Sequence, residues 1–519
     1  MGNVSAITAV GKRNVTVQNC FIQDGNATGP SAGITNGGSF GYGINFTGTN
    51  FSVIRNNTIL TNGSNNNYGI LLQTSLYNLI TNNSVNTQGS ADTNHGMYFT
   101  TIASLNNVTH NVIRTNGTGS NNGVETTTSG NVTFFNNTIT VRGTTAGSSA
   151  IAFGSSSNNM TAERNLLNVI STAGNSQGII AFVATQTRAL RNTIIASGGP
   201  EGDVRGIFMF FSNVMVADGN NISINRHQSS GIQFSSSNYL NATNNTIAVN
   251  GTQSDHGLFV SSANSLIFAD NNVSVTDTGV FGAGIYIDGG SLDHLLTTNR
   301  IYSSGGRTPA LEIAGTAARI NLSNNILRAD GSLSFAVYLA GTNQTIFENN
   351  TIENSRRWIN KTSTANATFT NTTFKTENGS IFFANQLYLN GSEPVEVIEE
   401  RLNITQNRAF INTTNLSMFN IGANITLNLS GLGITTAQAV VDYTDTGTFG
   451  ICPADVCTNT SFANSIFTFN VSHWTTFKAQ EFEVNDAPSG SSFILNSTNM
   501  SKNDTTQNLT AWFTTSDVD

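Results

Sequence analysis

The chain has 519 residues, of which 10% are charged, and its formal net charge is −8. Globular domains carry about 25% charged residues, so this surface must depend largely on uncharged polar groups. The sparse negative charge excludes a basic surface for nucleic acid. No apolar run approaches the roughly 18 residues that a membrane-spanning helix needs.

A short phrase, Gly-Ile-x-apolar, recurs every 25 to 28 residues along most of the chain. The twelve phrases begin at Gly43, Gly69, Gly96, Gly123, Ala150, Gly178, Gly206, Gly231, Gly257, Gly284, Ala310 and Ala336. A second phrase, Asn-x-apolar, keeps step with it at Asn57, Asn83, Asn111, Asn137, Asn165, Asn192, Asn220, Asn245, Asn271, Asn299, Asn325 and Asn350. A fixed period in this range indicates a repeat architecture.

Both phrases predict short strands. Apolar residues lie at i and i+2, the period of a strand, and clusters of Ser, Gly and Asn separate one strand from the next. Short strands that return at a fixed period without helices stack in register as a parallel β-helix. Because Asn57 and Ile59 are two residues apart, we expect both side chains to point inward. Asparagine amides stacked about 4.8 Å apart can then hydrogen-bond to one another.

On these phrases, residues 1–380 resemble the right-handed parallel β-helix repeat proteins, a superfamily that includes pectate lyases and many surface proteins. The resemblance implies an all-β fold whose first part is a single-stranded, right-handed β-helix. Counting the phrases gives about 12–13 coils. The resemblance implies no particular activity, because this architecture supports many chemistries.

Residues 381–484 are predicted to form a β-sandwich, since alternating apolar residues and turn signals continue after the repeat ends. The runs Asn407 to Asn412 and Phe469 to Trp474 are similar to a module that recurs in archaeal surface proteins, which implies a cell-envelope setting. Residues 485–519 resemble a linker and the truncated start of an immunoglobulin- or cadherin-like module. Met1 to Val10 lack the features of a signal peptide, so we expect a piece of a longer polypeptide.

Sequons and cysteines both bear on the compartment. The chain contains 37 Asn-x-Ser/Thr sequons, more than its composition predicts. They indicate either a heavily N-glycosylated extracellular protein or a by-product of the repeated Asn-Asn-Thr-Ile phrase. Cys452 and Cys457 are placed for a local disulfide in an oxidising compartment, which leaves Cys20 over. An extracellular or cell-surface location is therefore predicted.

The x residue of each Gly-Ile-x-apolar phrase is expected to point outward, and we call this set the strip. The strip consists of Asn45, Leu71, Tyr98, Glu125, Ala152, Ile180, Phe208, Gln233, Phe259, Tyr286, Glu312 and Tyr338. Aromatic rings on a shallow polar face can stack on sugar rings. The candidate ligand-binding residues are therefore Tyr98, Glu125, Phe208, Gln233, Phe259, Tyr286, Glu312 and Tyr338. The alternative is ordinary cross-strand pairing or contact with a covering loop.

The densest group of ionisable residues precedes the strip in three successive coils. It comprises Glu201, Asp203, Arg205, Arg226, His227, Asp255 and His256. At about 4.8 Å per coil these side chains can gather on one edge. Paired carboxylates there could act as acid and base in glycoside hydrolysis, or hold Ca²⁺ and abstract a proton as in a pectate-type lyase. The alternative is a solvated loop without chemistry.

No metal or cofactor is predicted. Repeats of this kind are often assigned to periplasmic copper-binding proteins, but the 7 Met and 6 His of this chain are scattered. Two thiols without a further ligand nearby fall short of a zinc site. The Gly-Gly-x-Gly-x-Asp spacing of calcium-binding β-rolls is missing as well.

The sequence thus predicts a secreted or cell-surface protein that is non-catalytic and serves adhesion or recognition, with a polysaccharide or glycan as its partner. The first alternative is a polysaccharide lyase or glycoside hydrolase that acts on the same face. The second is a structural rod that binds nothing. Neither nucleic acid nor a membrane span is expected for these residues, and the oligomeric state is left open.

Overall fold

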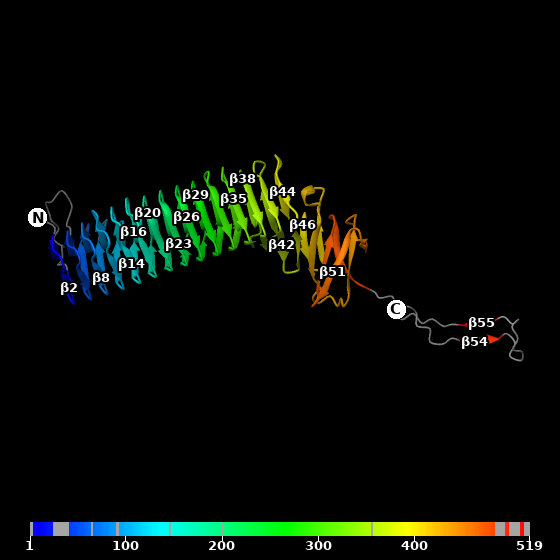
Figure 1. Cartoon of the computed structure of the whole chain (residues 1–519), viewed down its shortest axis with the longest axis horizontal. Helices are drawn as coiled ribbons and strands as arrows, with labels where there is room; N and C mark the ends of the chain where they lie inside the picture. Colours follow the sequence, from blue (N-terminus) through cyan, green and yellow to red (C-terminus); the bar gives the residue numbers. More distant parts are fainter. Residues whose placement is uncertain are drawn as a thin grey trace.

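The computed structural model describes residues 4–23, 41–63, 66–89, 93–144, 147–199, 202–353, 356–482, 494–497 and 509–512. Figure 1 shows a long rod of stacked strands that ends in a group of C-terminal strands. Each coil of the rod contributes one short strand to each of three sheets, and neighbouring coils pair in parallel. The predicted all-β chain with a parallel β-helix is confirmed.

The first sheet contains the Gly-Ile-x-apolar phrases. Its strands are β1 (Val4–Val10), β4 (Gly41–Thr47), β7 (Tyr68–Gln73), β10 (His95–Thr100), β13 (Val124–Thr126), β16 (Ser148–Phe153), β19 (Ser176–Phe182), β22 (Val204–Phe210), β25 (Ser229–Ser235), β28 (His256–Ser261), β31 (Ala283–Asp288), β34 (Leu311–Ile313), β37 (Val337–Leu339), β40 (Arg357–Lys361) and β45 (Val395–Ile398). The twelve phrases lie in or directly before the strands from β4 to β37, so β1 and β40 add one coil at each end.

The second sheet follows the first in every coil. Its strands are β2 (Thr16–Gln18), β5 (Val53–Arg55), β8 (Leu79–Thr81), β11 (Asn107–Thr109), β14 (Thr133–Phe135), β17 (Thr161–Glu163), β20 (Thr185–Leu190), β23 (Asn213–Asp218), β26 (Asn238–Thr243), β29 (Asn264–Ala269), β32 (Leu292–Thr297), β35 (Ala318–Ser323), β38 (Asn343–Glu348), β41 (Ala367–Thr370) and β44 (Leu387–Leu389).

The third sheet completes each coil. Its parallel strands are β3 (Phe21–Gln23), β6 (Thr58–Gly63), β9 (Ser84–Gly89), β12 (Val112–Gly117), β15 (Thr138–Gly143), β18 (Leu166–Ser171), β21 (Thr193–Gly198), β24 (Asn221–Asn225), β27 (Thr246–Gly251), β30 (Asn272–Val280), β33 (Arg300–Arg307), β36 (Ile326–Ala329), β39 (Thr351–Glu353) and β42 (Thr372–Thr376).

The interior of the rod explains the Gly-Ile-x-apolar phrase. In β10, Met97 and Phe99 are fully buried, whereas Tyr98 between them faces outward and is half-buried. The glycine also faces the interior: a Cβ on Gly123 would lie 2.2 Å from Ile139 Cγ2 in the third sheet. A large side chain has no room there, and three coils use alanine instead of glycine.

The second phrase forms a ladder of asparagines at the corner between the second and third sheets. Each side-chain amide nitrogen donates to the side-chain oxygen of the ladder asparagine in the next coil at 2.9 to 3.0 Å, from Asn57 to Asn350. The residue before each ladder asparagine turns the corner with a positive φ, which is 54° at Asn56. The predicted stack of inward-facing amides is confirmed, and it satisfies polar groups that would otherwise be buried without partners.

The C-terminal strands cover the last coil. Strands β43 (Gly379–Phe383), β44 and β45 run antiparallel to β42, β41 and β40, so each of the three sheets receives one closing strand. The third sheet then continues through β48 (Ala423–Asn428), β52 (Ile466–Val471) and β51 (Cys457–Ala463). Because the core of the rod continues into these strands, the final coil does not present a bare apolar end.

A further antiparallel sheet lies in the same region. It consists of β46 (Leu402–Thr405), β47 (Arg408–Ile411), β53 (Thr476–Glu481), β49 (Ala437–Asp442) and β50 (Gly450–Ile451). One short 3₁₀ turn, η1 (Ser417–Phe419), lies before β48, and Cys452 and Cys457 are joined by a disulfide bond. Most of the predicted module at 485–519 lies outside the described residues; β54 (Ile494–Ser497) and β55 (Leu509–Trp512) pair antiparallel.

Candidate functional site

The strip lies on the outer face of the first sheet in unbroken register. Tyr98 pairs with Glu125, Phe259 with Tyr286, and Glu312 with Tyr338. Outward residues of adjacent coils are therefore lateral neighbours, about 4.8 Å apart. The eight candidate ligand-binding residues are all half-buried, so part of each side chain remains accessible to a ligand.

Two other members of the strip are buried. Leu71 is 1% exposed and packs with Tyr42 and Tyr68, while Ala152 is 7% exposed. The strip is therefore covered at Leu71 and at Ala152, whereas its other members, including Asn45 at the N-terminal end, are half-buried.

A second column of side chains lies beside the strip, in positions that simple alternation along the strand does not predict. It is formed by the residue that precedes each phrase glycine, because that glycine and the next residue both turn inward. Its members include Tyr42, Tyr68, His95, Asn122, Ser149, Gln177, Arg205, Ser230 and His256. The signal was present in the sequence as an aromatic or polar residue directly before the glycine.

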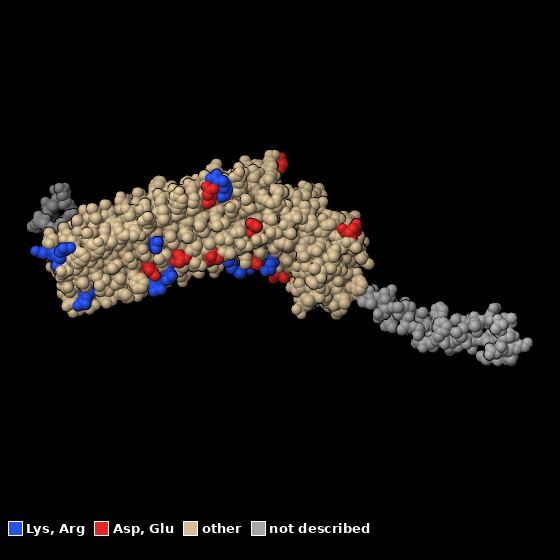
Figure 2. Space-filling view, viewed as in Figure 1, with Lys and Arg blue, Asp and Glu red and all other residues tan. Residues whose placement is uncertain are grey.

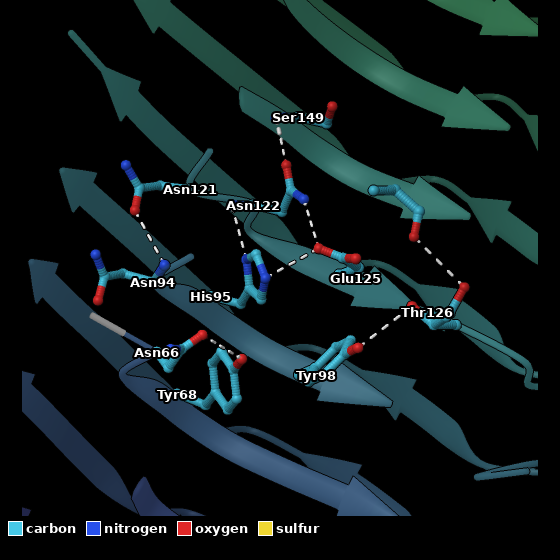
Figure 3. A network of polar contacts seen from close by, with 12 residues as sticks. Asn66, Tyr68, Asn94, His95, Tyr98, Asn121, Asn122, Glu125, Thr126 and Ser149 are labelled. Atoms are coloured by element: carbon cyan, nitrogen blue, oxygen red, sulfur yellow. Dashed lines mark hydrogen bonds and ion pairs between the residues drawn. The ribbon is translucent and has the colours of Figure 1, made fainter. Parts of the chain in front are cut away.

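Aromatic rings stack along the N-terminal part of this column (Figure 3). The ring centroids of Tyr42 and Tyr68 are 5.2 Å apart, and those of Tyr68 and His95 are 5.3 Å apart, with nearly parallel planes in both pairs. Tyr98 of the strip packs against Tyr68 at an interplanar angle of 54°. The rings therefore form a continuous aromatic stack over three coils, in which Tyr42, Tyr68 and His95 are buried and Tyr98 is half-buried.

The stack ends at a hydrogen-bonded group of polar residues (Figure 3). His95 Nδ1 accepts a hydrogen bond from the backbone N–H of Asn122 at 3.1 Å, and His95 Nε2 lies 2.9 Å from Glu125 Oε2. The Asn122 amide donates to the same carboxylate oxygen at 2.8 Å. Burial raises the pKa of Glu125, but hydrogen bonds from His95, Asn122 and Thr127 lower it by more, so this side chain is ionised at neutral pH.

A cavity of about 420 Å³ adjoins this polar group. Its polar lining includes Asn122, Glu125 and Gln177, and its apolar lining includes Ile180 and Phe182. Hydrogen-bonding side chains beside apolar surface can hold both the hydroxyl groups and the ring faces of a sugar.

A second cavity, of about 170 Å³, lies further along the same face. Asp203 accepts a hydrogen bond from Arg205 Nη2 at 2.6 Å, and Arg205 also donates to Gln233 of the strip. The guanidinium carbon of Arg205 lies 4.5 Å from the ring centroid of Phe208. Burial, more than any other effect, lowers the pKa of Arg205, although Asp203 opposes it.

Aromatic rings also connect the second cavity with the next part of the strip. Phe259 and Tyr286 are stacked with centroids 5.3 Å apart, and His256 packs on both of them. Burial lowers the pKa of His256 to about 4, so its imidazole is neutral at physiological pH. Phe259 and Tyr286 thus offer partly exposed, uncharged ring faces, while His256 is buried beside them.

A third cavity, of about 400 Å³, lies at the C-terminal end of the strip and is lined by Glu312, Tyr338 and Arg357 among others. Burial, and then the negative charge of Asp288, raise the pKa of Glu312 to about 7. Asp288 also accepts a hydrogen bond from the Tyr286 hydroxyl at 3.2 Å. This part of the face therefore contains a carboxyl group that titrates near neutral pH.

The candidate acid–base cluster is divided by the fold. Asp203, Arg205 and His256 line the second cavity together. Asp255 is fully buried in the rod, where its carboxylate accepts backbone hydrogen bonds from Ser229 and Gln253.

The remaining members of that cluster lie elsewhere. Arg226 is 4% exposed and donates to the carbonyl oxygen of Ser171 two coils away. His227 Nδ1 is 2.6 Å from Thr252 Oγ1 on the exposed surface. Glu201 lies outside the described residues. The structure therefore assembles one acid, one base and one guanidinium on the face, not a pair of carboxylates.

A larger hollow, of about 680 Å³, lies away from the strip, where the last coils meet the C-terminal strands. Its charged lining residues include Asp330, Arg356, Glu377 and Glu399. Asp330 is already engaged, since it forms an ion pair with Arg328 at 2.7 Å. The hollow shares no residue with the strip.

Charge is sparse on the surface that the structure describes. Figure 2 shows small, separate groups of charged residues on an otherwise uncharged face. Within the described residues, no three His, Cys, Asp or Glu side chains meet as a metal-binding set. Among those same residues there is also no helix long and apolar enough to span a membrane.

No protein-family model matches the chain, and no curated protein matches it either. Among solved structures, it is similar to the A-module of the mannuronan C-5 epimerase AlgE6 of Azotobacter vinelandii, with 11% identity and a TM-score of 0.45 over 62% of this chain and 90% of that one. It is also similar to a tailspike protein of E. coli bacteriophage HK620 in complex with a pentasaccharide, with 11% identity and a TM-score of 0.38 over 82% and 85% of the two chains.

Proposed function

We propose that the chain is a secreted or cell-surface recognition protein that binds an extended polysaccharide along the outer face of its first sheet without cleaving it. The supporting observation is the register of the strip. Five half-buried aromatic side chains lie on one face: Tyr98, Phe208, Phe259, Tyr286 and Tyr338. Three cavities with polar linings lie along the same face.

The spacing of the coils suits a linear glycan. Each coil offers one outward strip residue about every 4.8 Å, which is close to the length of one sugar ring in an extended chain. Ring faces can stack on the aromatic residues, while hydroxyl groups bond to side chains such as Asn122, Gln177 and Gln233. Since the face is nearly flat and holds few charges, it favours contact over many sugars rather than one deep, tight site.

The test is a binding screen of the whole chain against a panel of neutral and acidic polysaccharides, combined with assays for released reducing ends and unsaturated products. We expect binding without product release. A Tyr286→Ala/Tyr338→Ala variant should lose at least about tenfold in affinity, because two ring faces contribute on the order of 1 kcal/mol each.

A matched control is available on another face. Tyr239 is 67% exposed and lies in β26 of the second sheet, so Tyr239→Ala removes a tyrosine of the same kind without touching the strip. Binding should be unchanged in this variant. Equal loss in the control and in the strip variant, or no binding to any polysaccharide, would contradict the proposal.

One observation favours a second candidate, a glycoside hydrolase or polysaccharide lyase. Glu312 and Asp288 are close enough for the charge of one to raise the pKa of the other, and a carboxyl group with a pKa near 7 can serve as a general acid. Product release that Glu312→Gln abolishes would establish this activity. Binding without product release by the unmodified chain would exclude it for the polysaccharides tested.

A further inference from the structure

We infer that the chain is N-glycosylated on its second and third sheets and at the corner between them, and that the face of the first sheet from β7 to β37 is kept free of glycan. This modification is separate from the proposed polysaccharide binding. The positions of the sequons in the fold, rather than their number, support it.

The structure separates two kinds of asparagine. Every sequon asparagine whose side chain the structure describes is exposed or half-buried, whereas the ladder asparagines are buried and none begins a sequon. The reason is geometric, because the second residue after a ladder asparagine is a core residue, such as Ile59 after Asn57 or Ile139 after Asn137. A glycan is bulky and must remain at the surface, so only the non-ladder asparagines can accept one.

A first set of sequons lies along the corner between the second and third sheets. Its asparagines directly precede a ladder asparagine and are all exposed: Asn56, Asn82, Asn136, Asn244 and Asn349. In each case the ladder asparagine that follows is buried in the rod. The Ser or Thr that completes the sequon begins a strand of the third sheet. In a three-sided coil this corner is opposite the first sheet, so glycans attached here point away from the strip.

A second set lies within strands, where asparagine is normally depleted. Its members are Asn107, Asn241, Asn321 and Asn343 in the second sheet, and Asn62, Asn116, Asn221, Asn250 and Asn272 in the third. Asparagine at the corner is favoured by its tolerance of positive φ, so the corner sequons alone could be a by-product of the repeat. That preference does not account for asparagine within strands, and an acceptor role does.

The first sheet contrasts with the other two. Its strands contain sequon asparagines only at the two ends, Asn45 in β4 and Asn360 in β40, and none in the strands from β7 to β37. The strip could carry sequons, because the Ser or Thr that completes one is already present two positions after three of its members, at Thr100, Ser235 and Ser261. A single change to asparagine would create a sequon at each, yet the chain has none there.

The chemistry is a transfer to the side-chain amide. The amide nitrogen of the acceptor forms a bond to the anomeric carbon of an oligosaccharide carried on a polyprenyl phosphate. The bond from that carbon to the phosphate oxygen breaks, the lipid phosphate leaves with the electron pair, and the amide nitrogen loses one proton. The acceptor must meet this lipid-linked donor in an exporting membrane, which agrees with an oxidising, extracellular destination.

The test is glycopeptide mass spectrometry on the chain recovered from its own cells. We expect glycan masses on peptides from both sets, represented by Asn136 at the corner and Asn321 in a strand. A matched pair of variants identifies the site: Thr138→Ala should abolish the addition at Asn136, while Thr138→Ser, which keeps the sequon, should retain it. Recovery of the Asn136 and Asn321 peptides only at their unmodified masses would overturn the inference.

The free face can be tested in the same cells. Gln233→Asn creates a sequon with Ser235 on the strip, and Gln233→Asn/Ser235→Ala carries the same change without the sequon. We expect the first variant to gain a glycan and to lose at least tenfold in polysaccharide affinity relative to the second. If the native chain shows no polysaccharide binding, the proposed function fails, but the masses of the Asn136 and Asn321 peptides still decide the glycosylation.

Discussion

The backbone N–H of Asp255 donates to Oδ2 of Asp277 at 3.3 Å, which places two fully buried carboxyl groups in adjacent coils of the rod. Asp277 occupies space that a glycine leaves open, because a Cβ on Gly282 would lie 2.4 Å from Asp277 Oδ2. In earlier coils the position of Asp255 is filled by Asn94 and Asn121, whose side-chain oxygens likewise accept a backbone N–H of the preceding coil. Asp255 thus takes an asparagine position and brings a titratable group into the interior.

This arrangement predicts a pH-dependent stability that Asp255→Asn removes. Burial, and then the charge of Asp277, raise the pKa of Asp255 from 3.8 to about 7. The folded chain therefore binds this proton more tightly than the unfolded chain, and the free energy of unfolding falls as the pH rises from about 4 to about 7. The variant is neutral throughout, so we expect its unfolding temperature to exceed that of the native chain by about 1–3 °C at pH 8 and to match it at pH 4.

Thermal unfolding followed by circular dichroism at the two pH values measures this difference. A variant that is less stable than the native chain at pH 8, or equally shifted at both pH values, would contradict the electrostatic cause.

Breaking the asparagine ladder should be costly. Asn192 donates to Asn220 Oδ1 at 3.0 Å and to the carbonyl oxygen of Ala162 at 2.9 Å, and its own oxygen accepts from Asn165. Asn192→Ala leaves these buried partners unsatisfied, so we expect a loss of about 2–4 kcal/mol in stability. Denaturant unfolding is the measurement, with Asn225→Ala, on the exposed side of β24, as a control that should change it by less than about 0.5 kcal/mol.

The phrase glycine should be intolerant of substitution. A Cβ on Gly257 would lie 2.1 Å from Val273 Cγ1 and 2.6 Å from the carbonyl oxygen of Gly284. Gly257→Val is therefore expected to prevent stacking of this coil and to yield aggregated or protease-sensitive chain. Gly450→Ala is the control, since no atom lies within 4 Å of the Cβ position there, and it should yield folded protein. Limited proteolysis of the two variants compares them directly.

Polysaccharide binding should depend on pH through Glu312. Because its pKa is raised to about 7, the third cavity gains a negative charge between pH 6 and pH 8. Affinity for a uronic-acid polysaccharide should therefore fall by about threefold to tenfold over this range, as expected for one added charge at short range. Glu312→Gln should bind equally at both pH values in calorimetry. A slope that persists in this variant would assign the titration to another group.

The repeat was readable from the sequence because it is local. The inward position of Ile59, the turn at Asn56 and the buried amide of Asn57 are set by backbone geometry within a few residues, and every coil repeats them. The strip was predictable for the same reason, since alternation along a strand assigns Tyr98 and Tyr286 to the outer face.

The outward orientation of the column beside the strip was harder to predict from the sequence. Strict alternation would place the residue before the glycine inside, but the glycine and the residue after it both face the interior, so His95 and Arg205 emerge outside. The interior position of Asp255 had the same origin, because its neighbour His256 belongs to this outward column. Because two successive residues of the phrase point inward, every residue before them points to the side opposite to the one that strict alternation predicts.

The sequence by itself therefore determined the coil, the asparagine ladder and the outward direction of the strip, because each depends on contacts that every coil repeats. The tertiary structure alone decided the pairing of His95 with Glu125, the separation of Asp255 from Asp203, and the placement of the sequon-free strands β7 to β37 on one face. Those relations join residues of different coils or different sheets. They depend on the number of residues in each coil and on which side chains pack between neighbouring coils. Neither property can be read from a single repeat.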